Sequence, residues 1–184
     1  FCVSGAAAGE SVKAGAKLAQ QVGTALAVGK HILLTGATTG IPEYAAKAYK
    51  KAGGKMSLGV SPASTKIEHI YKYRLPTDPY DMILYTGLHY VGRDALLINS
   101  ADAVISIGGR LGTLHEFTIA METKTPIGFL HGAGGIGDEI KKIMEAAKPV
   151  RSGTVFYSDD VADLIKQITS HLNRLRSDHL DIYK

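Results

Sequence analysis

The stretch AVISIGGRLGTLHE, residues 103–116, contains the pattern from which the architecture of this chain can be worked out. Residues 103–107 form an apolar strand pattern, and a helical pattern begins shortly afterwards. Between them lie Gly108, Gly109 and Gly112, which let the backbone approach a ligand closely because no Cβ intervenes. Free N–H groups at the start of the helix face that ligand, and the helix dipole favours negative charge there. The stretch therefore predicts a phosphate-binding turn between a strand and a helix.

Two interpretations of Glu116 are open. It lies three residues after Thr113, so both side chains share one helix face. A carboxylate repels phosphate, so Glu116 makes sense if it serves another part of the ligand, such as sugar hydroxyls or a developing positive charge. A capping box formed by Thr113 and Glu116 explains the same pair without any ligand. Taken alone, these residues do not decide between the two.

The composition is that of an ordinary soluble globular protein. With 184 residues, 45% hydrophobic and 21% charged, we expect residues 1–184 to form a single domain. The formal net charge of +4 suits an anionic small ligand. Lysine and arginine form no dense block, so nucleic acid is not the expected partner.

Cysteine, histidine and hydropathy patterns exclude several further classes. Cys2 is the one cysteine and cannot form an internal disulfide, which favours a reducing, cytoplasmic location. No apolar run approaches membrane-spanning length and no signal peptide is visible, so no membrane partner is expected. The seven histidines lack metal-ligand spacing, so no metal site is predicted, and His115 is expected to be a solvated residue near a helix start.

Strand and helix patterns alternate along the chain. Apolar runs predict seven strands near residues 1–3, 31–35, 56–60, 82–86, 103–107, 126–130 and 154–157. Helical periodicity fills the intervals, with Gly29 ending the first helix and Pro42 in the first turn of the second. This alternation predicts an α/β, Rossmann-like, doubly wound parallel sheet of about seven strands with helices on both faces.

Four of the predicted strands end in glycine-rich turns, at residues 5–9, 36–40, 108–112 and 132–137. Ligands of open parallel sheets bind at the carboxyl ends of the strands, so these turns are expected at one edge around a nucleotide-sized site. Tight turns that simply use glycine are the alternative. The dinucleotide pattern G-x-G-x-x-G, the P-loop and the G-x-S-x-G elbow are all absent, which disfavours hydride transfer, ATP hydrolysis and serine hydrolase chemistry.

The segment 63–81 has the least regular pattern of the chain. It follows a strand end, so it could form a lid over the ligand, with Tyr71, Tyr73 and Arg74 stacking on a base. An ordinary surface excursion explains the segment equally well.

The pattern Gly108-Gly109-x-x-Gly112-Thr113-x-x-Glu116 resembles the P-G-G-x-G-T-x-x-E motif of the Lonely Guy (LOG) proteins and the wider SLOG superfamily, often labelled "possible lysine decarboxylase". Arg93, upstream of Ser100–Ile105, resembles the arginine that LOG proteins carry before the motif strand. The turn 5–9 and the segment 35–42 are similar to nucleotide-binding members grouped with molybdenum cofactor carrier proteins. The resemblance covers about residues 1–170.

In LOG enzymes the activity is hydrolysis of the N-glycosidic bond of a cytokinin-type nucleoside 5′-monophosphate to base and ribose 5-phosphate. The resemblance implies this phosphoribohydrolase activity, with no resident cofactor, and makes Glu116 and Arg93 the catalytic residues. It implies that the nucleotide and its phosphate bind at Gly5, Gly36, Thr38, Thr39, Gly108, Gly109, Arg110, Leu111, Gly112 and Thr113. The alternative is a non-catalytic carrier or sensor that binds molybdenum cofactor or a signalling nucleotide. A DNA-processing role, known from distant members, is disfavoured by the modest charge.

Some residues depart from the LOG pattern. Ile107 stands in place of the motif proline, Asp94 in place of the lysine after the arginine, and Arg110 enlarges the loop, where it could be an extra phosphate ligand. A salt bridge to Asp94 or Asp102 is an alternative role for Arg93. Related SLOG proteins are commonly dimers, and the apolar content of residues 88–98 exceeds what one sheet-packing face needs, so a homodimer or higher oligomer is expected.

Overall fold

The computed structural model describes residues 1–148 and 153–178. In this part of the chain seven parallel strands form one sheet in the order β4-β3-β2-β1-β5-β6-β7. The strands are β1 (Cys2–Gly5), β2 (Leu33–Thr35), β3 (Ser57–Ser61), β4 (Met82–Tyr85), β5 (Val104–Ile107), β6 (Ile127–Leu130) and β7 (Val155–Ser158). The predicted α/β, Rossmann-like sheet is confirmed. The single domain over residues 1–184 stays a prediction, because residues 149–152 and 179–184 lie outside the described part.

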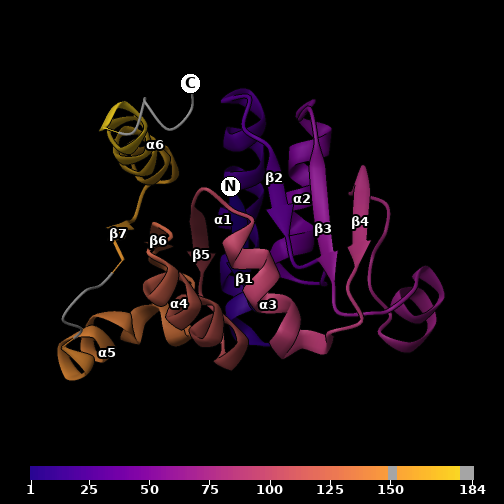
Figure 1. Cartoon of the computed structure of the whole chain (residues 1–184). Helices are drawn as coiled ribbons and strands as arrows, with labels where there is room; N and C mark the ends of the chain where they lie inside the picture. The colour runs from indigo at the N-terminus through magenta and orange to yellow at the C-terminus, as the bar shows by residue number, and fades with distance from the viewer. Residues whose placement is uncertain (149–152, 179–184) are drawn as a thin grey trace.

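Helices cover both faces of the sheet. They are α1 (Glu10–Val28), α2 (Ile41–Lys51), α3 (His89–Asn99), α4 (Leu111–Thr123), α5 (Ile140–Ala147) and α6 (Val161–Asp178), with a π-helical turn at Glu68–Lys72 and a 3₁₀ turn at Gly135–Glu139. In Figure 1, α3 and α4 lie in front of the sheet, and α1 and α2 lie behind it. None of the described helices combines the length and hydrophobicity needed to cross a membrane.

Side chains alternate between two cores, as expected for strands that are buried on both faces. Val3 and Ile105 pack with α1, α2 and α6, whereas Cys2 and Val104 face the core beneath α3 and α4. Helices α1 and α2 approach each other backbone to backbone, since a Cβ on Gly23 would overlap the main chain of Ala45. The two cores hold the central strands rigidly, which fixes the loops at their carboxyl ends.

The order of the strands creates a switch point between β1 and β5. The chain first builds β1 to β4 in one direction, then returns through α3 to place β5 on the other side of β1. Gly5 pairs with Ile107 at the end of these two strands. The following turns diverge to opposite faces, and this divergence leaves a crevice at the edge where ligands of such sheets bind. The strands run downward in Figure 1, so this edge is the lower one.

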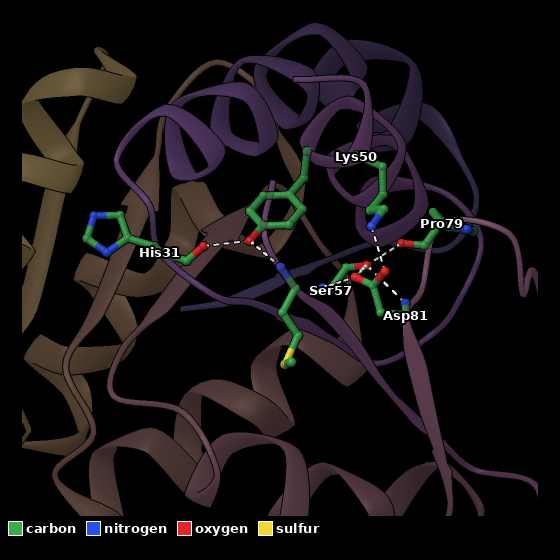
Figure 2. A network of polar contacts seen from close by, with 7 residues as sticks. His31, Lys50, Ser57, Pro79 and Asp81 are labelled. Carbon is green, nitrogen blue, oxygen red and sulfur yellow. Dashed lines mark hydrogen bonds and ion pairs between the residues drawn. The ribbon is translucent and has the colours of Figure 1, made fainter. Parts of the chain in front are cut away.

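The irregular segment 63–81 is anchored to the sheet by buried polar contacts. His69 is fully buried, with Nδ1 2.8 Å from Ser61 Oγ and Nε2 3.0 Å from the Pro76 carbonyl oxygen. Figure 2 shows a further network where the segment enters β4. The Asp81 carboxylate accepts hydrogen bonds from the Ser57 N–H at 2.7 Å and from Lys50 Nζ at 2.6 Å. The segment lies beyond the outer strand β4 in Figure 1. Hydrogen bonds of Ala63 with Ser61 and of Asp81 with Ser57 tie its two ends to β3.

Candidate functional site

A cavity of about 480 Å³ opens at the switch point, between the turns after β1 and β2, the start of α4 and one side of α3. Nine of the predicted site residues line it: Gly5, Gly36, Thr38, Arg93, Arg110, Leu111, Gly112, Thr113 and Glu116. The remaining three, Thr39, Gly108 and Gly109, are not among its lining residues. Residues that the sequence argument did not select also line the cavity, namely Val3, Ser4, Ala6, Ala7, Ala8, Pro42, Tyr90 and Asp94.

The first turn of α4 offers backbone N–H groups to the cavity. Arg110 is the N-cap, and the intrahelical hydrogen bonds begin with Leu114 N–H, which donates to the Arg110 carbonyl at 3.0 Å. The amides of the residues between them, 111–113, carry the partial positive charge of a helix N-terminus. Gly112 lines the cavity, and no described neighbour lies within 4 Å of the position that a Cβ would take there. This helix start is therefore open to an anionic ligand group.

The capping-box interpretation is wrong. Because α4 begins at Leu111, Thr113 lies inside the helix and is not its N-cap. The Glu116 carboxylate instead accepts a hydrogen bond from the hydroxyl of Ser4, at the end of β1. Glu116 therefore belongs to a polar cluster that bridges the sheet and α4.

The three predicted residues outside the lining shape the turns behind it. Gly108 and Gly109 have φ values of 60° and 105°, a left-handed backbone that favours glycine. Their carbonyl oxygens accept hydrogen bonds from Gly137 and Ile136 at 3.2 and 3.1 Å, so the fourth glycine-rich turn lies directly against them. Thr39 Oγ1 donates to the Ala7 carbonyl at 3.2 Å, which joins the turns after β1 and β2.

Glu116 is almost completely buried, with 9% of its surface exposed. Burial is the main cause that raises the pKa of Glu116 to about 7, and the nearby Asp94 charge raises it further. The Ser4 hydrogen bond and the charges of Arg93 and His115 act in the opposite direction. A carboxyl group with this pKa changes its charge close to neutral pH, which is typical of acid–base groups in enzyme sites.

Arg93 is also buried and lies between two carboxylates. Its Nη1 is 3.2 Å from Asp94 Oδ1 and 3.6 Å from Glu116 Oε1. The alternative salt bridge to Asp94 is thus present, whereas Asp102 pairs with Arg176 at 3.8 Å. These contacts are ion pairs by distance, but Nε and Nη1 of Arg93 have no hydrogen-bond acceptor among the described residues. Arg93 therefore lines the cavity with buried N–H donors that no described residue pairs.

His115 is less solvated than the sequence suggests. Its side chain is 38% exposed, and Nδ1 lies 2.9 Å from Asp94 Oδ2. It therefore contacts the site through Asp94 rather than standing free at the helix start.

Tyr90 is the aromatic residue of the cavity wall. Its ring centroid lies 5.9 Å from the guanidinium carbon of Arg93 and 5.7 Å from the ring centroid of Tyr73. Tyr73 also forms a hydrogen bond with His89, at 2.7 Å between its hydroxyl and Nδ1. No residue of 63–81, a fully described segment, lines the cavity, and Tyr71 is exposed. The segment 63–81, for which a lid was one of two interpretations, thus contacts the wall residue Tyr90 through Tyr73.

Sequence signals existed for some of the unselected residues. Ser4 is a polar residue near the end of an otherwise apolar strand, and Asp94 adjoins the selected arginine. No group of three or more His, Cys, Asp or Glu side chains in the described ranges could hold a metal ion.

Comparison with known proteins identifies similar chains. A model of the SLOG cluster4 family matches residues 2–165. The crystal structure of the protein TM1055 superposes with a TM-score of 0.79 at 24% identity, covering 92% of this chain and 97% of that one. A molybdenum cofactor binding protein from Rippkaea orientalis has a TM-score of 0.72 at 25% identity, with 93% and 94% covered. The molybdenum cofactor carrier protein from Chlamydomonas reinhardtii has a TM-score of 0.70 at 27% identity, with 92% and 94% covered.

Proposed function

Because the chain belongs to the SLOG cluster4 family, we propose that it binds a nucleoside 5′-monophosphate in this cavity and hydrolyses its N-glycosidic bond. The products are the free base and ribose 5-phosphate. One observation carries the proposal: a buried carboxyl group, Glu116, shares a 480 Å³ cavity with the open N-terminus of α4. The helix start suits the phosphate, and the carboxyl group suits the sugar.

Phosphate binding follows from the local electrostatics. The amides of residues 111–113 and the dipole of α4 stabilise an anion at the helix start. Arg110 lines the same end of the cavity and adds a positive charge. Glu116 lies further along the helix, so a bound phosphate at the first turn directs the ribose toward the carboxyl group.

The chemistry requires stabilisation of positive charge on the sugar. When the bond from C1′ to the base nitrogen breaks, its electron pair leaves with the base, and the ribose becomes an oxocarbenium-like cation. Ionised Glu116 stabilises this cation and holds the ribose hydroxyls. Water then adds its oxygen to C1′, and the proton that it loses balances the proton that the departing base takes up. Arg93, whose Nε and Nη1 have no acceptor in the described part of the chain, orients the substrate or steadies the base.

The proposal is tested by incubating the protein with a panel of nucleoside monophosphates and measuring ribose 5-phosphate. We expect turnover for at least one member, and its loss in Glu116→Gln with ligand binding retained. Folding of the variant is checked by circular dichroism. Turnover that survives in Glu116→Gln contradicts the assigned role of the carboxylate.

A non-catalytic carrier of molybdenum cofactor is the second candidate, favoured by the similarity to the proteins from Rippkaea orientalis and Chlamydomonas reinhardtii. The cavity residues fit the phosphate end of such a ligand, with the α4 amides and Arg110. The metal centre would receive no thiolate from this chain, because Cys2 is buried beneath the helices and is not a lining residue. Tight cofactor binding by folded protein that turns over no nucleoside monophosphate would favour this candidate.

A further inference from the structure

A row of ionisable side chains connects the protein surface with the cavity. His115 Nδ1 is 2.9 Å from Asp94 Oδ2, Asp94 Oδ1 is 3.2 Å from Arg93 Nη1, and Arg93 Nη1 is 3.6 Å from Glu116 Oε1. The side chain of His115 is 38% exposed, whereas that of Asp94 is 7% exposed. The row therefore begins in solvent and ends at the buried carboxyl group.

We propose that Asp94 and His115 are a positioning pair that holds the Arg93 guanidinium beside Glu116. Through this pair the buried side chains of the cavity are in contact with a partly solvent-exposed residue, His115. This inference rests on the proposed function only where it takes Arg93 and Glu116 as groups that contact the ligand. Neither Asp94 nor His115 needs to touch the ligand. Their role is exerted through Arg93.

The geometry of Asp94 supports this role. A buried carboxylate is costly unless its oxygens are paired, and both oxygens of Asp94 have a partner. Arg93 lies nearer to Asp94 than to Glu116, so Asp94 keeps the guanidinium from closing fully onto Glu116. This arrangement leaves Nε and Nη1 of Arg93 without an acceptor among the described residues. The pairing of His115 with the far oxygen holds Asp94 in the rotamer that faces Arg93.

The same groups set the charge of Glu116. Its surroundings are Ser4 and Cys2 on β1, Arg93 and Asp94 on α3, and His115 on α4. Burial raises the pKa of Glu116 most and Asp94 adds to the increase, whereas His115 lowers it. Replacing Asp94 and replacing His115 should therefore shift the pKa of Glu116 in opposite directions. Side chains that packed nearby without a charge would not produce this opposition.

Titration of Glu116 in ligand-free full-length protein tests the electrostatic part. Carboxyl carbon NMR of glutamate-labelled protein is compared for wild type, Asp94→Asn and His115→Ala. We expect a lower pKa of Glu116 in Asp94→Asn and a higher one in His115→Ala. His131→Ala is the matched control, because His131 also lies near an aspartate, Asp138 at 3.9 Å, but does not line the cavity. Identical titration in all four proteins overturns the proposal.

His115→Asn separates positioning from charge. The asparagine amide can donate to Asp94 where Nδ1 does, but it carries no charge. We expect His115→Ala to weaken nucleoside monophosphate binding roughly tenfold, as for the loss of one charge-assisted hydrogen bond, and His115→Asn to restore most of that loss. Equal losses in both variants contradict the positioning role. Thermal unfolding of each variant shows that it is folded.

Failure of this inference is distinguishable from failure of the proposed function. If the pKa of Glu116 shifts as expected in the variants but no nucleoside monophosphate is bound or hydrolysed, the positioning pair is supported and the proposed substrate is wrong. If wild type hydrolyses a nucleoside monophosphate but Glu116 titrates alike in every variant, the positioning pair is contradicted and the proposed function is supported.

Discussion

Gly36, in the turn after β2, lies directly against the guanidinium of Arg93 on α3, and a Cβ on Gly36 would overlap Arg93 Nη1. Because Gly36 has no side chain, the Arg93 guanidinium can occupy its position against the turn after β2. The overlapped atom is the end of a flexible side chain, so the guanidinium, and not the backbone, would have to move.

Replacing Gly36 with alanine is therefore expected to affect the site more than the fold. The displaced Arg93 loses its place between Asp94 and Glu116, and ligand binding should weaken roughly tenfold, in line with a lost charge-assisted hydrogen bond. The melting temperature should change by only a few degrees. Calorimetric titration and thermal unfolding measure the two effects. Unchanged affinity in Gly36→Ala would show that the position of Arg93 does not matter for binding.

Gly112→Ala tests the anion site at the start of α4. Nothing described lies within 4 Å of the added methyl group, and Gly112 does not have a left-handed backbone. Alanine in this helical turn should leave stability unchanged or raise it by about 0.4–1 kcal/mol. The methyl group projects into the cavity, so affinity for a nucleoside monophosphate should fall. A variant that is as stable as wild type and binds equally well would place the phosphate elsewhere.

Glu116 predicts a characteristic dependence of stability on pH. Its pKa is about 7 in the folded protein because of burial, well above the ordinary value near 4.5. The folded state therefore holds this proton more tightly, and the stabilisation is fully present below about pH 4.5 and lost as the pH rises through 7. Its size is on the order of 1–3 kcal/mol. Glu116→Gln, which mimics the neutral form, should gain stability relative to wild type between pH 5 and about pH 8.

Melting curves of the two proteins across this range measure the difference. A constant gap between wild type and Glu116→Gln at every pH would contradict a raised pKa. In the activity assay, the same group should produce a rise in turnover as the pH passes about 7, because the ionised carboxylate stabilises the sugar cation.

Variants of Asp81 and Lys50 allow the contribution of a buried hydrogen bond to be compared with that of a surface ion pair. Asp81→Ala leaves the N–H of buried Ser57 without its acceptor, which should cost about 1–3 kcal/mol of unfolding free energy. Lys50→Ala removes only a partly exposed ion pair and should cost less than about 1 kcal/mol. Chemical denaturation of both variants is the measurement. Equal costs would mean that the ion pair, and not the backbone contact shown in Figure 2, anchors β4.

The assembly state is predicted to be a homodimer that uses the exposed face of α3. Val91 is 72% exposed there, with Leu88 and Leu96 also exposed. Sedimentation at micromolar concentration should show a dimer, and Val91→Asp should shift it toward the 19.5 kDa monomer. Val28→Asp on α1, where the valine is 74% exposed, is the matched control and should leave the dimer intact. A monomeric wild-type protein would contradict the prediction.

The sequence predicted the fold well because hydrophobic periodicity acts locally. Each predicted strand occurs close to its predicted place and helices occupy the intervals between the strands, since an apolar run flanked by glycines has few other ways to be buried. The capping-box interpretation failed because it assumed that α4 begins at Thr113. The helix begins at Leu111, and Glu116 finds its partner in Ser4, more than a hundred residues away in the chain.

The composition of the cavity was only partly predictable for the same reason. Spacing along the chain identified the helix start and Glu116 as candidates, the resemblance to LOG proteins added Arg93, and all of them line the cavity. Spacing could not show that Gly108 and Gly109 turn their carbonyl groups toward the fourth glycine-rich turn. Nor could it show that Tyr90, rather than Tyr71 or Tyr73, forms the aromatic wall. The positions of these carbonyl groups and of Tyr90 depend on how the helices pack across the sheet. A local sequence pattern does not contain that information.

The pairing of Gly5 with Ile107 gives the cavity a place in the folding process. The two turns on opposite sides of the cavity follow β1 and β5, which are far apart in the sequence. Contacts between such distant segments form slowly because the entropy of the intervening chain must be lost first. A polypeptide that has folded only through β4 therefore lacks one wall of the cavity. A ligand bound there stabilises only chains that have completed this closure. Ligand-dependent protection from proteolysis would thus report that β5 has paired with β1.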